Sequence, residues 1–188
     1  MKNQKVKKMV GVAILSAVVV ILQLLGSFIH LGPVSISLVL IPIVVGAALY
    51  GPASGGFLGV VFSIVVLLQP DTAFFYGINF FGTVLTVLLK GFLAGWLSGL
   101  VFYALSRKNT FLAVLTAAVI CPIVNTGIFF LGCRLFFWDA LAAVGGGNAF
   151  IYVVTVMIGF NFLAEFATNV ICAPVILRIL HAAKLVEK

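Results

Sequence analysis

Six polar side chains that could bind a small molecule fall inside hydrophobic stretches between residues 90 and 169. Three are charged and three are amides: Lys90, Arg134, Glu165, Asn125, Asn161 and Asn169. An ionisable group inside a membrane is costly, so it is expected either to pair with another group or to serve a function such as binding. Asn161, Glu165 and Asn169 recur at every fourth position, which predicts one polar face on a helix. That face must contact protein or water, because lipid cannot satisfy it.

These six side chains allow two interpretations. In the first, Glu165 neutralises Lys90 across a helix interface and the amides link neighbouring helices. In the second, the side chains line a polar pocket that opens outward, with Arg134 near its mouth. If all three charged groups contribute, their balance of one positive charge favours an anionic or carboxylate-bearing ligand. Both interpretations can hold together, because a fixed ion pair can form the floor of a pocket.

Motifs for other kinds of chemistry are absent from the sequence. There is no GxxxxGK[ST] motif, so we expect no ATP site in this chain, and no HExxH motif or clustered Cys/His set that would hold a metal. Cys121, Cys133 and Cys172 lie in apolar segments without ligand spacing and are interpreted as packing residues. We therefore expect a protein that is not an enzyme and carries no cofactor of its own.

The composition indicates an integral membrane protein. Of the 188 residues, 64% are hydrophobic and 8% are charged, whereas about 25% are charged in a typical soluble domain. Hydrophobic stretches follow one another with little polar sequence between them, which predicts a single membrane domain over residues 1–188. The net charge of +7 does not indicate nucleic-acid binding, because the basic residues form no separate surface interleaved with aromatic residues.

Hydrophobic length and turn signals predict an all-α, compact bundle of six transmembrane helices after a basic tail at residues 1–8. The helices are expected at about residues 9–30, 35–50, 53–68, 80–105, 110–138 and 150–181. Gly51 and Pro52 predict a tight turn between the second and third helices, which could form either a short hairpin or a fully spanning pair.

The basic residues indicate the orientation of this bundle. Most of them fall in three clusters, namely the N-terminal tail, the loop at 106–109 and the C-terminal end. With six helices all three clusters lie on one side of the membrane, while Asp71 and Asp139 lie on the other. The positive-inside rule then predicts that both termini are cytoplasmic.

Small residues stand out at two places. Gly145, Gly146 and Gly147 fall in an outward loop, where they give the backbone access to unusual angles and suit a lid that opens and closes. Ala13 and Ala17 lie four residues apart in the first helix, directly after the lysine-rich tail. Such a stripe permits close helix contact, either within the protein or with another membrane subunit.

The whole chain resembles the substrate-binding S components of energy-coupling factor (ECF) transporters. The resemblance rests on the six-helix pattern, the basic tail and the sequence AILSA at 13–17, which corresponds to the family's alanine motif for docking the coupling subunit. Three further stretches are similar to the family, namely LYGPASGGFLGVVFS at 49–63, LLKGFLAGWLSGLVFYALSRKN at 88–109 and CPIVNTGIFFLG at 121–132. The last resembles a segment of members that take up vitamins such as pantothenate.

The resemblance implies a function in a bacterial cell membrane. A vitamin would be captured from outside in a pocket of the last three helices and the outward loops, with pantothenate slightly favoured over riboflavin or folate. Two separate cytoplasmic ATPases would hydrolyse ATP and act through a transmembrane coupling subunit docked at Ala13 and Ala17. The loaded S component would then topple in the membrane and release its ligand inward.

Two other classes of protein stay open from the residues alone. A stand-alone secondary transporter would use Glu165 and Lys90 as a proton relay and would show pH-coupled uptake. A membrane enzyme or assembly protein would need a nucleophile or a metal site, which the sequence does not offer.

Overall fold

The computed structural model describes residues 2–26 and 39–183, and all regular structure in these residues is helical. The elements are α1 (Lys2–Gly26), α2 (Leu40–Tyr50), α3 (Pro52–Leu67), η1 (Pro70–Thr72), α4 (Ala73–Ile78), α5 (Phe80–Ser106), α6 (Thr110–Gly132), η2 (Cys133–Phe137), α7 (Trp138–Val144), α8 (Ala149–Ile151), η3 (Tyr152–Gly159) and α9 (Phe160–Ala182). The segment η1 is a 3₁₀ turn, whereas η2 and η3 are π-helical.

Every predicted helix has a counterpart, but the predicted count of six spans is not confirmed. In the described residues four helices are long and apolar enough to cross a membrane, at Gln4–Gly26, Phe80–Ser106, Thr110–Val144 and Ala149–Ala182. A fifth span is formed if α3 and the following Pro70–Ile78 segment count as one helix bent by 77°. With 11 residues, α2 is about 16 Å long and too short to cross by itself. The predicted helix ends at 27–30 and 35–38 lie outside the described residues.

Local sequence explains where several helices begin. Asn79, Asn109 and Asn148 are the N-caps of α5, α6 and α8, and each side chain accepts a hydrogen bond of 2.8–3.1 Å from the backbone N–H three residues later. Between α2 and α3, Gly51 has a φ of +98° and Pro52 occupies the first turn of α3. The predicted turn at this position is confirmed, and it returns the chain sharply onto α2.

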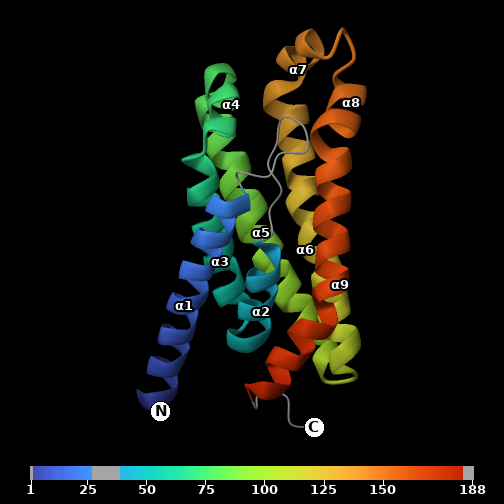
Figure 1. Cartoon of the computed structure of the whole chain (residues 1–188). Helices are drawn as coiled ribbons and strands as arrows, with labels where there is room; N and C mark the ends of the chain where they lie inside the picture. Colours follow the sequence, from blue (N-terminus) through green and yellow to red (C-terminus); the bar gives the residue numbers. More distant parts are fainter. Residues whose placement is uncertain (1, 27–38, 184–188) are drawn as a thin grey trace.

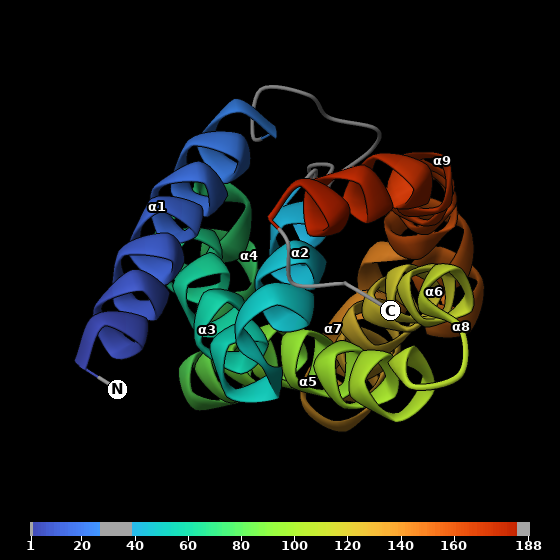
Figure 2. The ribbon, with the colours of Figure 1, turned by 90° about the horizontal axis from the view of Figure 1, so that it is seen from below.

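The helices form an elongated bundle around the short α2 (Figures 1 and 2). α2 packs against α1, α3, α5, α6 and α9, while α1 lies at the edge of the bundle against α2 and α3 (Figure 2). The start of α1, the turn between α5 and α6 and the end of α9 lie at one end, and α4, α7 and α8 at the other (Figure 1). The sequence predicts three basic clusters on one side of the membrane. The helix ends that carry these clusters lie at the same end of the bundle.

Glycines bring α3 and α5 into close contact. These residues are Gly55 and Gly59 of α3 and Gly91 and Gly95 of α5, here called the glycine interface. A Cβ atom added to any of them would collide with the backbone of the opposite helix, so the two backbones approach as closely as small residues permit. One turn further along α3, Ser63 Oγ donates a hydrogen bond of 2.6 Å to the carbonyl of Val87 on α5.

A second polar link joins α1 to the bend between α3 and α4. Gln23 Nε2 donates to Gln69 Oε1 over 3.1 Å, and Gln69 Nε2 donates to the backbone carbonyl of Gln23 over 3.2 Å. Both side chains are buried. The last part of α1 is thus attached to the point at which the chain changes direction after α3.

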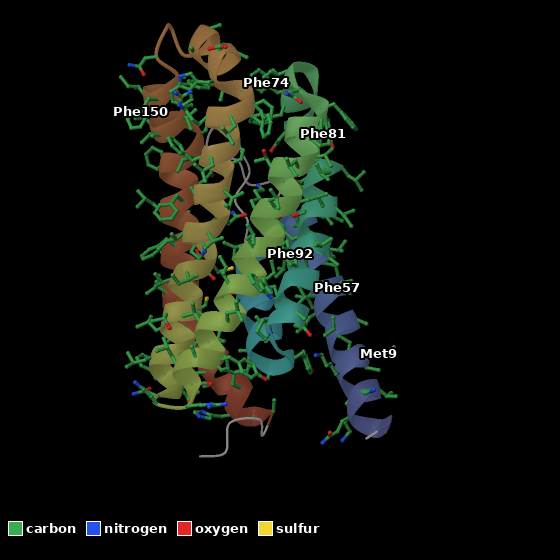
Figure 3. The ribbon with its side chains drawn as sticks, turned by 180° about the vertical axis from the view of Figure 1, so that it is seen from behind. Met9, Phe57, Phe74, Phe81, Phe92 and Phe150 are labelled. Carbon is green, nitrogen blue, oxygen red and sulfur yellow. The ribbon has the colours of Figure 1, made fainter. Side chains whose placement is uncertain are left out.

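The outer surface of the bundle is apolar. Met9, Phe81 and Phe150 are 71%, 72% and 55% exposed, and these and other large apolar side chains point outward along the whole length of the molecule (Figure 3). A water-soluble monomer rarely exposes contiguous apolar surface of this extent. The long apolar helices and this surface agree in describing a multi-pass membrane protein.

Two apolar clusters make up the interior. The first combines buried side chains of α1, α2, α3, α5, α6 and α9, such as Leu40, Phe62 and Ile176. The second lies toward the end that holds α4, α7 and α8, and contains Phe75 and Leu141 together with side chains of η2 and η3. Between the two clusters, α6 and α9 carry buried polar side chains.

Candidate functional site

Most of the polar residues predicted for the site lie between the two apolar clusters. On α6, Asn125 follows the last buried residue of the first cluster and precedes the first buried residue of the second. On α9, the stripe Asn161, Glu165 and Asn169 is flanked in the same way. Together with Lys90 of α5, these residues are here called the polar layer.

The stripe on α9 faces the interior of the bundle, as its spacing predicts. Asn161, Glu165 and Asn169 are only 6%, 5% and 1% exposed. Asn169 Nδ2 donates to the Glu165 carbonyl over 2.8 Å, and Asn161 Nδ2 donates to the carbonyl one turn before it over 3.2 Å. Asn125 Nδ2 lies 3.5 Å from Glu165 Oε2 and so links α6 to α9. Lipid is excluded from this face.

Several acceptors in and beside the polar layer are buried without a hydrogen-bond partner in the described part of the chain. They include Oδ1 of Asn125 and Asn169 and Oγ1 of Thr86. Buried polar atoms in proteins are nearly always paired with protein or water, so such atoms mark places where a ligand or water is expected. Thr86 was not predicted, although its position four residues before Lys90 on α5 places it on the same helix face.

The Lys90 ammonium group lies between aromatic rings of neighbouring helices. Its Nζ atom is 5.2 Å from the ring centre of Phe129 on α6 and 5.6 Å from that of Phe62 on α3. Such cation–π contacts stabilise a partly desolvated cation, and the charge on Glu165 attracts the ammonium at longer range. Neither contact is a conventional hydrogen bond, because a ring face offers no lone pair to an N–H group.

Arg134 lies apart from the polar layer. Its side chain is exposed on η2, and the guanidinium carbon lies 4.7 Å from the ring centre of Trp138, one turn further along. The structure therefore does not bring Arg134 together with the buried amides. It lies toward the end of the bundle with α7, and both its predicted place near the mouth of a pocket and its contact with a ligand stay predictions.

Gly145, Gly146 and Gly147 have a structural role at the end of α7. Gly146 and Gly147 have φ angles of +68° and +100°, and the Gly147 N–H donates a 2.8 Å hydrogen bond to the carbonyl of Ala142. This is the geometry of a Schellman motif, which ends a helix. The lid function proposed for these glycines stays a prediction.

Two π-helical segments border the second apolar cluster. The segment η2 continues α6, and η3 precedes α9, so both lie between the polar layer and the end of the bundle with α7 and α8. Such segments are rare and are frequent at functional sites. No pattern in the sequence indicates them.

Ala13 and Ala17 are both exposed on α1. Their stripe is consequently not part of the interior of this chain, which removes the explanation that it serves internal packing. Exposed small residues leave a smooth surface on a peripheral helix, and such a surface suits contact with another membrane helix.

One comparison with known proteins gave a match. A family model described as "ECF transporter, substrate-specific component" matches residues 7–177, which is most of the chain. No curated protein and no solved structure gave a significant match.

Proposed function

Because the chain belongs to the family of substrate-specific components of ECF transporters, we propose that it captures a small water-soluble vitamin in the polar layer. Members of this family are binding subunits of transporters and not enzymes. The observation that best supports the proposal is the burial of the amides and Glu165 between two apolar clusters, with the half-buried Lys90 on the neighbouring helix α5. In the proposed site these side chains would supply a cation, a carboxylate and amide groups to one ligand.

The distribution of charge supports an anionic ligand that also carries neutral polar groups. Lys90 would bind the anionic group, while Oδ1 of Asn125 and Asn169 would accept hydrogen bonds from hydroxyl or amide donors. Exposed Arg134 would attract the anion before it enters. Pantothenate, which combines a carboxylate with hydroxyl and amide groups, fits this set slightly better than riboflavin or folate.

The remaining steps of uptake would depend on partner subunits. We propose that both termini are cytoplasmic in a bacterial cell membrane, and that a transmembrane coupling subunit docks on the exposed face with Ala13 and Ala17. Two cytoplasmic ATPases would provide the energy, and the loaded chain would topple to release the vitamin. The glycines at 145–147 would act as a lid over the entrance.

Purification of the chain without its partners provides the main test. A single vitamin should copurify and be identified by small-molecule mass spectrometry, and calorimetry should then measure tight binding to the emptied protein without ATP. Uptake into vesicles by this chain alone, driven by a proton gradient, would contradict the proposal and support a stand-alone transporter. In that case Glu165→Gln should abolish the pH-coupled uptake.

The variant Lys90→Met tests the proposed anion contact. A charge-assisted hydrogen bond is worth about 1.5–3 kcal/mol, so affinity for the copurifying vitamin should fall roughly tenfold to hundredfold. Lys108→Met, at an exposed position in the turn before α6, removes the same charge and should leave affinity unchanged. Equal affinity of both variants, measured by calorimetry on protein of normal melting temperature, would limit Lys90 to a structural role.

A further inference from the structure

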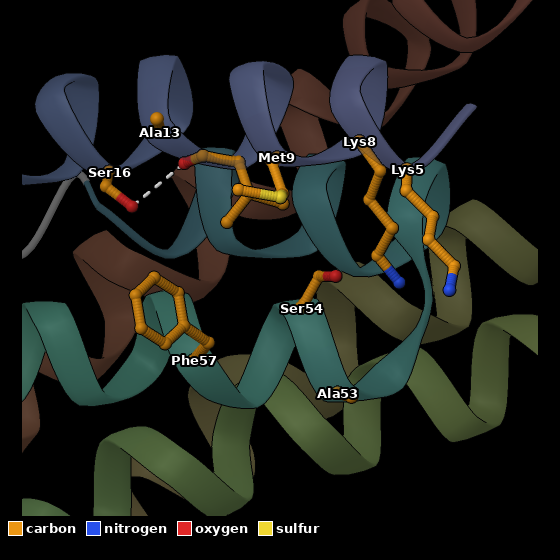
Figure 4. Close-up of a pocket in the computed structure, with 9 residues that line it drawn as sticks. Lys5, Lys8, Met9, Ala13, Ser16, Ala53, Ser54 and Phe57 are labelled. Atoms are coloured by element: carbon orange, nitrogen blue, oxygen red, sulfur yellow. Dashed lines mark hydrogen bonds between the residues drawn. The ribbon is translucent and has the colours of Figure 1, made fainter. Parts of the chain in front are cut away.

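A groove of about 770 Å³ lies between α1 and the start of α3, on the outer surface of the bundle (Figure 4). It is separate from the polar layer. Met9 and Phe57 form much of its wall and are 71% and 54% exposed. Such large apolar side chains at the surface need an apolar occupant.

The polar atoms within the groove are already satisfied. Ser16 Oγ donates to the carbonyl of Val12 over 2.8 Å (Figure 4), and Ser54 Oγ donates to the carbonyl of Tyr50 over 3.1 Å. Both hydroxyl groups are therefore used within their own helices. The groove offers its occupant an almost entirely apolar channel.

The positive charges of the groove are confined to one end. Lys5 and Lys8 are three residues apart on one face of α1, and both side chains extend toward α3 (Figure 4). Both are exposed, and the acidic residues of the described chain lie in other elements, at Asp71, Asp139 and Glu165. The two ammonium groups are thus available to an anion from outside the protein.

From these observations we propose that the groove binds one anionic phospholipid, with an acyl chain along Met9 and Phe57 and the headgroup phosphate at Lys5 and Lys8. From Lys5 to Ser16 the helix rises about 16 Å, which matches the roughly 15 Å of hydrocarbon in one bilayer leaflet. A lipid has this asymmetry, with one charged end and an apolar chain of leaflet length. A transmembrane helix of a partner would fill the channel but would leave the paired lysines without a counter-charge. Ala13 also lines the groove, so the inference rests on the proposed function in one respect: the lipid occupies the groove in the chain without its partners and leaves when the coupling subunit docks.

Native mass spectrometry can test the site on protein reconstituted with equal amounts of phosphatidylglycerol and phosphatidylcholine. One phosphatidylglycerol should be retained preferentially after mild delipidation. Each lysine near an anionic headgroup is worth roughly a fivefold change in affinity, so Lys5→Gln with Lys8→Gln should lower retention roughly 25-fold. The matched control, Lys7→Gln with Lys108→Gln, removes two exposed charges outside the groove and should retain the lipid.

A second variant tests the apolar channel independently of the two lysine charges. Ala53→Trp fills the groove while keeping both lysines, and it should also lose the retained lipid, whereas vitamin binding measured in parallel should not change. Equal retention of the two lipids would overturn the proposal, as would equal loss in the Lys7/Lys108 control. Crosslinking of an Ala53→Cys variant to a coupling-subunit helix, with no phosphatidylglycerol retained by the chain alone, would assign the groove to that helix and likewise overturn it.

Discussion

The glycine interface and the alanine stripe, which is formed by Ala13 and Ala17 of α1, are built from the same pattern of small residues four positions apart. Their surroundings differ. In the glycine interface both α3 and α5 carry the pattern, and their backbones meet inside the protein. On α1, Ala13 and Ala17 are exposed, and Ala13 lines the surface groove between α1 and α3. The pattern therefore predicts close helix contact in general, and a complementary stripe elsewhere in the chain decides whether that contact is internal.

The largest effect on stability is expected for Gly59→Leu. The new side chain would collide with the carbonyl of Gly91, so the helices would have to separate, at a cost of about 3 kcal/mol. Gly127→Leu is the matched control, because a Cβ atom there meets nothing within 4 Å. Thermal unfolding in detergent would measure both, and similar melting temperatures for the two variants would show that the interface is looser than described.

A smaller loss is expected for Ser63→Ala, which removes the hydrogen bond to Val87 across the same interface. Hydrogen bonds between membrane helices contribute roughly 0.5–1.5 kcal/mol, so reversible unfolding in mixed micelles should show a decrease of that size. Ser106→Ala removes only a local hydrogen bond at an exposed position and serves as the control. An equal decrease in both variants would mean that the contact between α3 and α5 does not depend on Ser63.

The smallest change in stability is expected for Ala17→Trp, at under about 0.5 kcal/mol, because the side chain is exposed. Vitamin binding should also be unchanged, while ATP-driven uptake with the partner subunits should fall to background because the bulky side chain blocks docking. Ala13→Trp should behave similarly, and Ala167→Trp, at an exposed position on α9, should retain uptake. If Ala17→Trp lost vitamin binding as well, the alanine stripe would belong to the folded interior.

Much of the helical organisation could be predicted from sequence because hydrophobic length and turn residues are local signals. The helix predicted at 80–105 corresponds to Phe80–Ser106, which begins at an Asn cap. The helix α4, the bend of 77° before it and the π-helical segments were not predicted. These features lie between the polar layer and the end of the bundle with α4, α7 and α8, and no spacing of residues within one segment indicates them.

The candidate site could be predicted in part for the same reason. The stripe on α9 follows from helix periodicity within one segment. The rings around Lys90 come from Phe62 and Phe129 on two other helices, and no spacing in the sequence indicates that these three residues meet. Thr86 was missed because a single threonine in a membrane helix usually bonds to its own backbone.

The reciprocal link between Gln23 and Gln69 has a consequence for how this chain can evolve. Replacing either glutamine alone would leave an amide atom of the other without its partner in a nearly dry environment, whereas replacing both by apolar residues would leave only the backbone carbonyl of residue 23 to be satisfied. Natural selection therefore acts on the two positions together. Among homologous chains, positions 23 and 69 are expected to be inherited as a polar pair or as an apolar pair, and seldom as one of each.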